Sequence, residues 1–352
     1  MKYRLAVAAV IFAGAGVAAG ADAPAQADRS PGSGYRVVGR FEVGGEGGWD
    51  FLAVDEKRHH LLVTRGDAVQ VVDMADGRLI ATLTGLHGSH GVAVAGDQAF
   101  ISNGRSNSVT VVDLDTLKTT GSIDVAGIGP DAILYDSQAG TVYTMNHNSG
   151  NISVIRAGGS KPGATIPAAD GLEVAVLDGK GRLFVNAEDA GQIIMVDTAT
   201  GKRMAQWKLG SCEGPTGLAI DTAHDRLFTV CANNRMMVVD ATSGRLVAEL
   251  PIGARPDGAA FDPALGNAYS SNGEGSLTVV HEDDAEHFHV VENLPTQAGA
   301  RTIALDPATH RLYLPAASYG PVPAATADAP KPRAPMIPGS FRILVVEPPG
   351  AN

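Results

Sequence analysis

The stretch "DRLFTVCANNRMMVVDATSGRLV" (225–247) alternates apolar and polar residues, breaks at an Asn-Asn pair, alternates again and turns at Ser-Gly. Nearly the same pattern occurs in "DQAFISNGRSNSVTVVDLDTLKT" (97–119) and in "GRLFVNAEDAGQIIMVDTATGKR" (181–203). Short alternating runs bounded by Gly, Asn and Asp are typical of β-strands joined by tight turns. The stretch therefore predicts a strand–turn–strand unit that recurs along the chain.

A repeat of about 42 residues accounts for most of the chain. Each unit contains four short runs that predict strands, separated by an acidic turn, a polar break and a Gly-containing turn. The first runs open at positions spaced 40, 41, 41, 44, 41 and 44 residues apart, namely Asp50, His90, Asp131, Leu172, Thr216, Asp257 and Arg301. Four antiparallel strands per unit are typical of a propeller blade, so the sequence predicts an all-β, seven-bladed β-propeller.

The last unit supplies only three of its four strands. A fourth strand is available at the other end of the chain, at 35–43. Pairing of this segment with 341–346 closes the ring and removes an exposed sheet edge, which otherwise favours aggregation. We therefore expect residues 28–352 to form a single propeller, closed by an N-terminal strand that completes the last blade.

Residues 1–27 are typical of a secretory signal peptide. Lys2 and Arg4 precede an apolar run, and small residues follow that run. Two A-x-A triplets predict cleavage after Ala21 or Ala27. No later stretch approaches the ~20 apolar residues that a membrane-spanning helix needs. We expect an exported protein, periplasmic or secreted, with no membrane span in the mature chain.

The chain carries a formal net charge of −11, and 43 Gly and 20 Pro accompany only 18% charged residues. This composition favours a turn-rich β-protein over a helical bundle or a disordered chain. A globally acidic protein repels nucleic acid unless it has a local basic face, and no Lys- or Arg-rich run occurs. We expect a monomer whose partner is a protein or a small molecule, with no nucleic-acid partner.

Three blades carry a version of the phrase that names the YVTN-repeat propellers, at 100–103 (FISN), 143–146 (YTMN) and 269–272 (YSSN). The run 107–113 also fits the continuation of that phrase, and the chain resembles the family over residues 35–348. The resemblance implies a seven-bladed propeller of a type common among exported bacterial proteins. It implies no single activity, because the family has members proposed to bind DNA, members at cell surfaces, and distant relatives that are lyases or dehydrogenase subunits.

In a propeller, the starts of the first strands and the ends of the second strands lie on one face, around the mouth of the central channel. The chain places ionisable or amide side chains at most of these positions, Glu173 among them. Convergence of such groups at a concave mouth marks the best candidate site. We expect ligand contacts from six of these residues: Arg65, Asn103, Asn146, Asp257, Asn272 and Arg301.

Asp50, His90 and Asp131 open the first strands of three neighbouring blades and are candidate ligands of a divalent cation. Carboxylate oxygens and an imidazole nitrogen suit an ion that polarises a carbonyl group or activates water. His147 and Glu188, which follow second strands, are the candidate catalytic proton carriers. The alternative is a hydrated polar rim that requires no cofactor, because blade length rather than metal geometry sets the spacing of these residues.

Cys212 and Cys231 are the only cysteines. Cys212 lies in the loop that enters the fifth blade, and Cys231 ends the second strand of that blade, so both belong to the mouth face. An exported compartment permits a disulfide, which we expect here; a free thiol or a metal-binding pair is the alternative.

The segment 315–340, "PAASYGPVPAATADAPKPRAPMIPGS", contains seven prolines where a short loop between two strands would suffice. A Pro/Ala-rich segment is semi-extended and cannot pack a core. We expect it to lie over the mouth. It is interpreted as a lid with Tyr319 and Arg333 reaching inward, as a tether for a partner, or as a passive insertion.

Two further polar features have structural interpretations. Asp residues that follow first strands, such as Asp221 and Asp262, are expected to cap the next turn by accepting backbone N–H groups. The stretch "HEDDAEHFHVVEN" (281–293) is expected to be a charged, solvated outer edge, with an exposed metal-binding patch as the alternative.

Two function classes fit these features best. The first is an exported binding or scaffolding module that recognises a protein or a small ligand at the mouth. The alternative is a metal-assisted lactonase or lyase with its site at the same mouth. A subunit that serves a quinone-dependent dehydrogenase system is a third class. The sequence names no reaction and no ligand.

Overall fold

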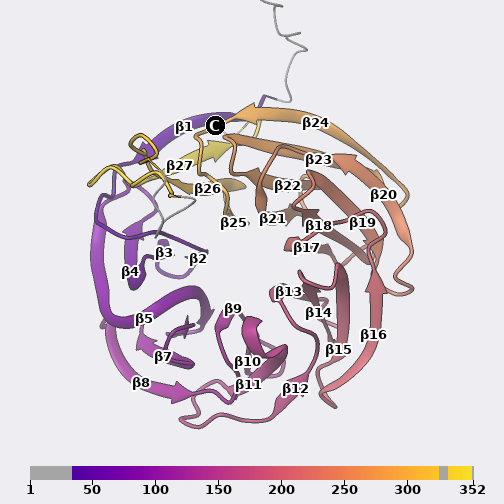
Figure 1. Ribbon diagram of the computed structural model, residues 1–352, viewed down its shortest axis with the longest axis horizontal. Helices are drawn as coiled ribbons and strands as arrows, with labels where there is room; N and C mark the ends of the chain where they lie inside the picture. Colours follow the sequence, from indigo (N-terminus) through magenta and orange to yellow (C-terminus); the bar gives the residue numbers. More distant parts are fainter. Residues whose placement is uncertain (1–33, 325–331, 351–352) are drawn as a thin grey trace, which may run out of the picture. The chain divides into compact units, whose positions relative to one another are not determined.

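The computed structural model describes residues 34–324 and 332–350; the predicted signal peptide at 1–27 lies outside the described residues. Within the described part, the blades are arranged in a ring, as the view down the ring axis shows (Figure 1). The only helix among the described residues is the single turn η1 (His147–Ser149), and no described helix is long and apolar enough to cross a membrane. The all-β propeller fold is confirmed.

Each blade is an antiparallel sheet whose four strands are counted here from the ring axis outward. The inner strands are β2 (Leu52–Asp55), the second half of β5 (Leu79–Ala95), β9 (Pro130–Asp136), β13 (Leu172–Leu177), β17 (Pro215–Asp221), β21 (Pro256–Asp262) and β25 (Ala304–Asp306). The second strands are β3 (His60–Thr64), β6 (Gln98–Asn103), β10 (Thr141–Asn146), β14 (Arg182–Ala187), β18 (Arg226–Cys231), β22 (Asn267–Asn272) and β26 (Arg311–Ala316).

Farther from the axis lie the third and outer strands of the blades. The third strands are β4 (Gly66–Asp73), β7 (Ser108–Asp113), β11 (Asn151–Arg156), β15 (Gln192–Asp197), β19 (Arg235–Asp240), β23 (Ser276–Asp284) and β27 (Arg342–Glu347). The outer strands are the first half of β5, β8 (Lys118–Asp124), β12 (Thr165–Pro167), β16 (Lys202–Lys208), β20 (Leu246–Pro251), β24 (His287–Pro295) and β1 (Arg36–Phe41).

Strand β5 is 17 residues long and belongs to two blades. Its first half pairs with β4, where Leu79 lies opposite Val72, and its second half pairs with β6, where Val92 lies opposite Ile101. Blades 1 and 2 therefore form one seven-stranded sheet, while each of the other five blades is a separate four-stranded sheet. The predicted number of seven blades holds, although the sheets number six.

The ring is closed by its N-terminal strand. β1 pairs antiparallel with β27, with Val37 opposite Val346 and Phe41 opposite Ile343. This pairing completes blade 7 in the order β25, β26, β27, β1. Just before β1, the hydroxyl of Tyr35 lies 2.8 Å from that of Tyr269 in blade 6, which ties the closing strand to the neighbouring blade.

The hydrophobic core consists of seven clusters, each between two neighbouring blades. Between blades 3 and 4, for example, Tyr143 and Met145 of β10 pack with Leu183 and Val185 of β14. Second strands have blades on both sides, which is why all residues of β10 are buried. The blades therefore pack rigidly, with the start of every inner strand held near the ring axis.

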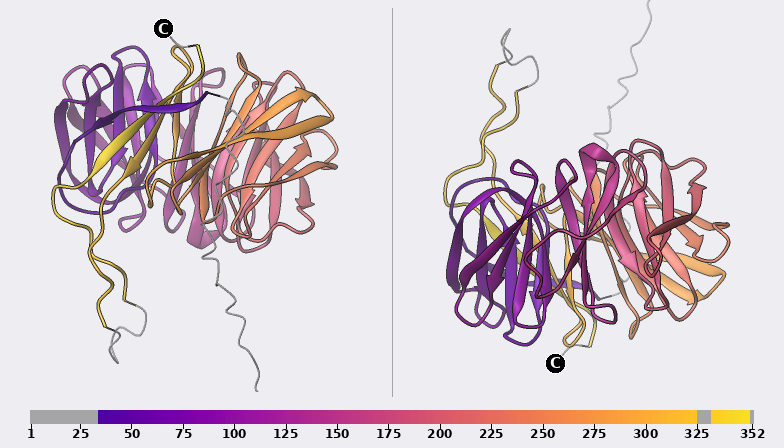
Figure 2. Two further views of the ribbon diagram at one scale, coloured as in Figure 1. Left: turned by 90° about the horizontal axis from the view of Figure 1, so that it is seen from above. Right: turned by 90° about the horizontal axis from the view of Figure 1, so that it is seen from below.

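The Pro/Ala-rich insertion between β26 and β27 begins and ends as a paired ribbon. Tyr319 forms an antiparallel bridge with Met336, and Gly320 N donates to Pro335 O at 2.8 Å. The described ends project away from the ring in Figure 2 and lie over its periphery in Figure 1. The expectation that the segment lies over the mouth does not hold for the ends drawn in Figure 1, although Tyr319 and Arg333 near its base line a cavity beside Arg301.

Candidate functional site

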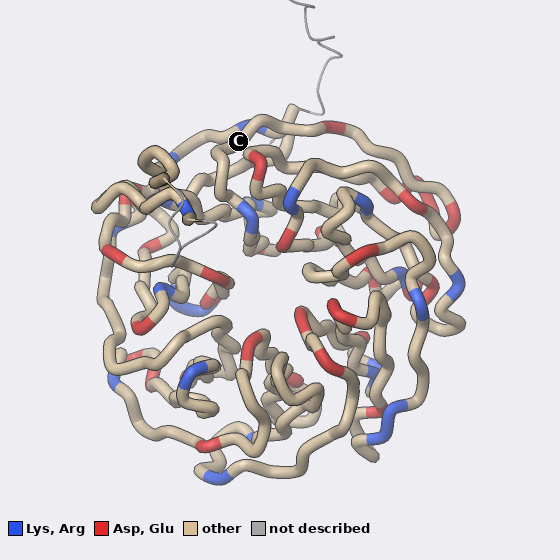
Figure 3. The backbone as a smooth tube through the Cα atoms, in the orientation of Figure 1, with Lys and Arg blue, Asp and Glu red and all other residues tan. Residues whose placement is uncertain are grey.

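One residue from the start of each inner strand contributes to a ring of mostly polar side chains around the axis. This set, called the mouth ring below, consists of Asp50, His90, Asp131, Glu173, Thr216, Asp257 and Arg301. Figure 3 shows that Asp and Glu positions recur around the axis. The blade repeat thus brings residues some 40 positions apart in the chain to one place, as predicted.

His90 lies between two carboxylates from the neighbouring blades. Its Nδ1 atom is 2.8 Å from Asp50 Oδ2 and 3.5 Å from Asp131 Oδ1. The first contact is a hydrogen bond, whereas Asp131 Oδ1 is buried and has no hydrogen-bond partner. The three predicted metal ligands therefore come together, with ligand atoms within 4.8 Å of one another.

A second set of possible ligand atoms shares Asp131. Asp131, His147 and Glu173 also bring three such atoms within 4.8 Å. His147 opens η1 directly after β10, and its Nδ1 atom lies 3.1 Å from Glu173 Oε1 and 3.2 Å from Leu172 O. Two imidazoles and three carboxylates thus lie side by side in this half of the mouth.

Arg301 supplies positive charge on the other side of the mouth ring. Its guanidinium pairs with Asp257, lies 3.5 Å from Asp50 Oδ1 and donates to Trp49 O at 3.0 Å. Burial opposes its charge, but Asp257 and Asp50 outweigh burial and raise the pKa of Arg301. Two carboxylates lie against this guanidinium, and the ring holds two more, Asp131 and Glu173, so it carries an excess of potential negative charge.

Burial and mutual repulsion shift the titration of these carboxyl groups. Burial, together with the charge of Asp50, raises the pKa of Asp131 to about 6. Burial, followed by the charges of Asp131 and Glu188, raises the pKa of Glu173 to about 10. The hydrogen bond with Asp50 raises the pKa of His90 in spite of burial. Either protons or a bound cation must therefore neutralise part of the mouth at neutral pH.

The two predicted proton carriers have different surroundings. His147 contacts Glu173 and is a member of the second ligand set. Glu188 follows β14, is half-buried, and adds negative charge to the environment of Glu173 and of Asp257. Both side chains belong to the mouth and both affect Glu173, which contacts His147 and is repelled by the charge of Glu188. The raised pKa of Glu173 favours its protonated form.

A cavity of about 490 Å³ adjoins the mouth at Arg301. Trp49, Arg255, Tyr319 and Arg333 are among its other lining residues. The indole Nε1 of Trp49 is buried without a hydrogen-bond partner, although the ring packs against Tyr319. The two insertion residues expected to reach inward, Tyr319 and Arg333, thus line this side cavity, where the guanidinium groups and the free indole N–H of Trp49 suit an anionic ligand group.

The predicted ligand-binding asparagines are engaged inside their blades. Asn146 Nδ2 donates to Asn151 Oδ1 at 2.7 Å and to Ser153 Oγ at 2.8 Å. Asn103 and Asn272 likewise donate to hydroxyl groups of their own blades, and all three side chains are buried. These amides link second strands to third strands, so we leave them out of the proposed site.

Arg65 is also engaged away from the mouth ring. Its side chain is buried, lies over the ring of Phe341 at 3.7 Å from the centroid, and donates to Gln70 Oε1 at 2.6 Å. It also donates to the carbonyls of Gly44, Glu46 and Gly47. Burial lowers the pKa of Arg65 to about 10. The residue anchors the loop between β1 and β2 and is not part of the proposed site.

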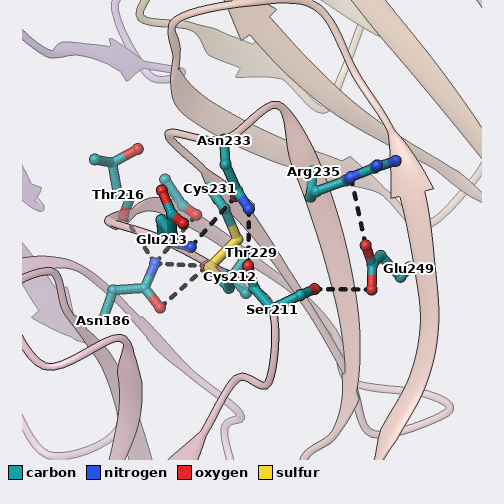
Figure 4. Close-up of a disulfide and its surroundings, with 11 residues drawn as sticks. Asn186, Ser211, Cys212, Glu213, Thr216, Thr229, Cys231, Asn233, Arg235 and Glu249 are labelled. Carbon is teal, nitrogen blue, oxygen red and sulfur yellow. Dashed lines mark hydrogen bonds and ion pairs between the residues drawn. A yellow bond between two sulfur atoms is a disulfide. The ribbon is translucent and has the colours of Figure 1, made fainter.

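The predicted disulfide between Cys212 and Cys231 is present, with a Cα–Cα distance of 5.5 Å (Figure 4). Cys212 lies in the loop before β17, and Cys231 ends β18. Asn233 reinforces the same loop, because its Nδ2 donates to Ser211 O at 2.7 Å. The bridge therefore fixes the entry loop of blade 5 beside the mouth.

Sequence reasoning missed two groups of polar residues. The unpartnered indole of Trp49 depends on loop packing and has no pattern in the sequence. A third set of possible ligand atoms, from Asp221, His224 and Glu282, lies away from the mouth ring. The one feature of the sequence that could have indicated this set is His224, a histidine in the acidic turn after β17.

Comparison with known proteins supports the fold. No protein-family model matches the chain. Two proteins named "uncharacterized protein YncE", from Salmonella typhimurium and Salmonella typhi, are each 26% identical over 204 residues, which is 55% of this chain and 51% of the relative. The chain thus matches only about half the length of these curated relatives.

A solved structure, Kuenenia stuttgartiensis hydrazine synthase, superimposes with a TM-score of 0.68 at 17% identity, over 83% of this chain and 95% of that chain. At this identity the likeness shows the fold alone. The propeller architecture is therefore supported by sequence relatives, by a structural neighbour and by the strand topology.

Proposed function

We propose that the protein is an exported binding propeller that holds a divalent cation at its mouth and recognises its ligand there. The observation that carries this proposal is the convergence of Asp50, His90 and Asp131, in which Asp131 Oδ1 is buried without a hydrogen-bond partner. A mixed set of two carboxylates and one imidazole suits Zn²⁺ or Mn²⁺. A bound cation offsets the excess negative charge of the mouth ring.

The side cavity gives the ligand a second point of attachment. Arg301 belongs both to the mouth ring and to the cavity, where Arg255 and Arg333 add positive charge. A small ligand with an anionic group fits this arrangement, because the anion faces guanidiniums while another polar group reaches the cation. We propose a small anionic molecule rather than nucleic acid, since the chain has a net charge of −11.

Calorimetric titration of the full mature chain with Zn²⁺ and with Mn²⁺ tests the cation site. The His90→Ala variant should lose at least ~10-fold in affinity at the mouth, because one of three ligands is removed. His310→Ala is the matched control, since His310 pairs with Asp262 at 2.8 Å elsewhere in the ring. Unchanged affinity in His90→Ala would end the proposal.

The cellular setting follows from the same proposal. We propose a periplasmic or secreted, monomeric protein of the YVTN-repeat type, matured by cleavage after Ala21 or Ala27. The disulfide beside the mouth supports an oxidising compartment. N-terminal sequencing of the protein from the periplasm should begin at Asp22 or Asp28; an intact Met1 in that fraction would contradict it.

A metal-assisted lactonase or lyase is the second candidate function, and Glu173 is the observation that favours it. A carboxyl with a pKa of about 10 is protonated at neutral pH, so Glu173 can donate a proton beside the cation site. In lactone hydrolysis, water adds to the carbonyl carbon and gives a proton to His147, the ring C–O bond breaks, and the leaving alkoxide takes the proton of Glu173. The proton on His147 then returns to Glu173, whose Oε1 atom lies 3.1 Å from His147 Nδ1. The cation would supply carbonyl polarisation or water activation when bound.

Lactone hydrolysis assayed with and without added Zn²⁺ separates the two candidates. The enzyme candidate predicts turnover that falls at least ~100-fold in Glu173→Gln, because one proton donor contributes that much. The binding candidate predicts no turnover in either protein and equal Zn²⁺ affinity at the Asp50 site. A panel of simple lactones is the probe.

A further inference from the structure

A cluster of ionisable side chains lies between blades 5 and 6, at the end of the inner strand opposite to the mouth. Asp221 is the last residue of β17, whereas Thr216 of the mouth ring is its second residue. His224 lies in the turn that follows β17, and Glu282 lies in β23 of the next blade. The cluster therefore joins two blades on the face away from the candidate site.

The ligand atoms of the cluster converge closely. His224 Nδ1 lies 2.7 Å from Asp221 Oδ2 and 3.0 Å from Glu282 Oε1. The three ligand atoms lie within 4.8 Å of one another. Glu282 Oε1 nevertheless has no hydrogen-bond partner, so the imidazole is close to it without the geometry of a hydrogen bond. The three atoms are therefore close enough together to share one ion.

Glu282 is a buried carboxylate that lies 3.0 Å from the imidazole of His224, which carries positive charge only when protonated. Its side chain is 2% exposed, and neither of its oxygens has a hydrogen-bond partner. The nearby Arg226 donates instead to Ala285 O at 2.7 Å and to Asp240 Oδ2 at 2.9 Å. An ionised group in this position is strongly unfavourable unless a cation or a proton joins it.

The local backbone builds this arrangement. Asp221 caps its turn as predicted: Oδ1 accepts from Ala223 N at 2.9 Å and Oδ2 accepts from His224 N at 3.1 Å, which places Oδ2 beside the imidazole of His224. In β23 the pairing register with β24 shifts between Glu282 and Asp284. Glu282 N donates to Gly266 O at 2.8 Å, which holds the residue in place beside the bulge.

We propose that Asp221, His224 and Glu282 form a site for a divalent cation that takes mixed nitrogen and oxygen ligands, such as Zn²⁺, and that the ion joins blade 5 to blade 6. Two carboxylates and one imidazole leave a fourth tetrahedral position for water. The side chain of His224 is 51% exposed, which gives the ion a path of entry. The site is independent of the proposed function at the mouth.

A histidine–aspartate pair elsewhere in the ring forms a hydrogen bond, in contrast to His224 and Glu282. His310 of blade 7 pairs with Asp262 of blade 6, with Nδ1 and Oδ2 at 2.8 Å in hydrogen-bond geometry. The two are not part of any possible metal-ligand set among the described residues. The neighbouring surface histidines are also paired, His287 with Asp284 and His289 with Asp283, as expected for a charged outer edge.

The competing explanation is a proton rather than an ion. Burial, with the charge of Asp221, raises the pKa of Glu282 to about 7, so a protonated carboxyl would also relieve the cluster. A proton-only cluster has no specific affinity for Zn²⁺ and gains no thermal stability from it. These two properties separate the explanations.

The test uses the full mature chain carrying His90→Ala and Asp131→Asn, which removes the mouth ligands. Titration with Zn²⁺ should still show about one ion per chain and a rise in Tm. Adding Glu282→Gln, which keeps the side-chain shape, should weaken this binding at least ~10-fold, and His224→Ala, at a half-exposed position, should do the same. His310→Ala should leave it unchanged.

Binding of Co²⁺ to the same background should give the visible absorption of a tetrahedral nitrogen–oxygen site. Equal Zn²⁺ affinity with and without Glu282→Gln, or no ion bound in the background protein, would overturn the inference. If the mouth binds no ion, the unmodified chain itself should bind the one ion that Glu282→Gln removes. The two proposals therefore fail separately.

Discussion

The mouth ring and the strand-end asparagines are both polar, and both recur with the blade repeat, yet their environments are opposite. Asn146 is buried with its amide donating to Asn151 and to Ser153. Asp131 is buried with one carboxylate oxygen that has no partner. The difference indicates which repeated polar positions serve the fold and which are left for a ligand.

Asn146→Ala should have the largest effect on stability and none on cation binding. The substitution leaves buried hydroxyl and amide groups without partners, which costs about 3 kcal/mol of unfolding free energy. Urea denaturation measures the loss, and Zn²⁺ titration of the folded variant measures affinity. If the variant were as stable as the parent, the buried asparagines would not be needed for the fold, and the contrast between them and the mouth ring would not hold.

The pH dependence of stability sharpens the comparison from the side of the mouth. Asp131, with a pKa of about 6, weakens the apo fold above that pH, and the weakening is relieved as the pH falls from about 6 towards about 4. His90 acts in the same direction, since its raised pKa gives a stabilisation that is lost as the pH rises.

Glu173 and Glu282, whose pKa values are raised to about 10 and about 7, act in the same direction. Chemical denaturation without metal should therefore give a free energy of unfolding that is higher at pH 5.5 than at pH 7.5, by roughly 2 kcal/mol or more. Saturating Zn²⁺ should reverse this order, because the ion binds the deprotonated ligands. The Asp131→Asn variant is the control and should show a smaller dependence on pH. A free energy of unfolding that rises with pH in the apo protein would contradict the excess of negative charge.

Arg301→Gln should tighten cation binding at the mouth. Loss of the guanidinium, whose Nη2 lies 3.5 Å from Asp50 Oδ1, removes about 1 kcal/mol of repulsion, or about fivefold in affinity. Calorimetry measures the change, with Arg235→Gln as the matched control, because Arg235 is exposed, is not a member of the mouth ring and pairs with Glu249 at 3.4 Å. Weaker cation binding in Arg301→Gln would show that the guanidinium positions Asp50 for the ion rather than repelling the ion.

Replacement of 321–334 by two glycines should have the smallest effect, within about 0.5 kcal/mol of unfolding free energy, because the ribbon adds little to the core. Thermal unfolding measures it, and the bridge between Tyr319 and Met336 is retained in the variant. A large loss of stability would mean that the insertion packs on the ring. If partner proteins bound this variant as well as they bind the parent, the insertion would not be a tether for a partner.

The propeller was predictable because a fixed period, four strands per unit and a missing last strand are all properties of the chain. The convergence of Asp50, His90 and Asp131 follows from the same period. The engagement of Asn146 was not predictable, since it depends on Ser153 across a strand pair. The set containing Glu282 depends on a register shift in β23, which the alternation of residues does not show.

The metal content of the purified mature protein tests the central claim most directly. After incubation with Zn²⁺ and removal of free ion, the chain should contain about one ion more than its His90→Ala/Asp131→Asn variant, because that variant lacks two of three ligands at the mouth. Equal ion content in the two proteins would contradict a cation site at the mouth of the propeller.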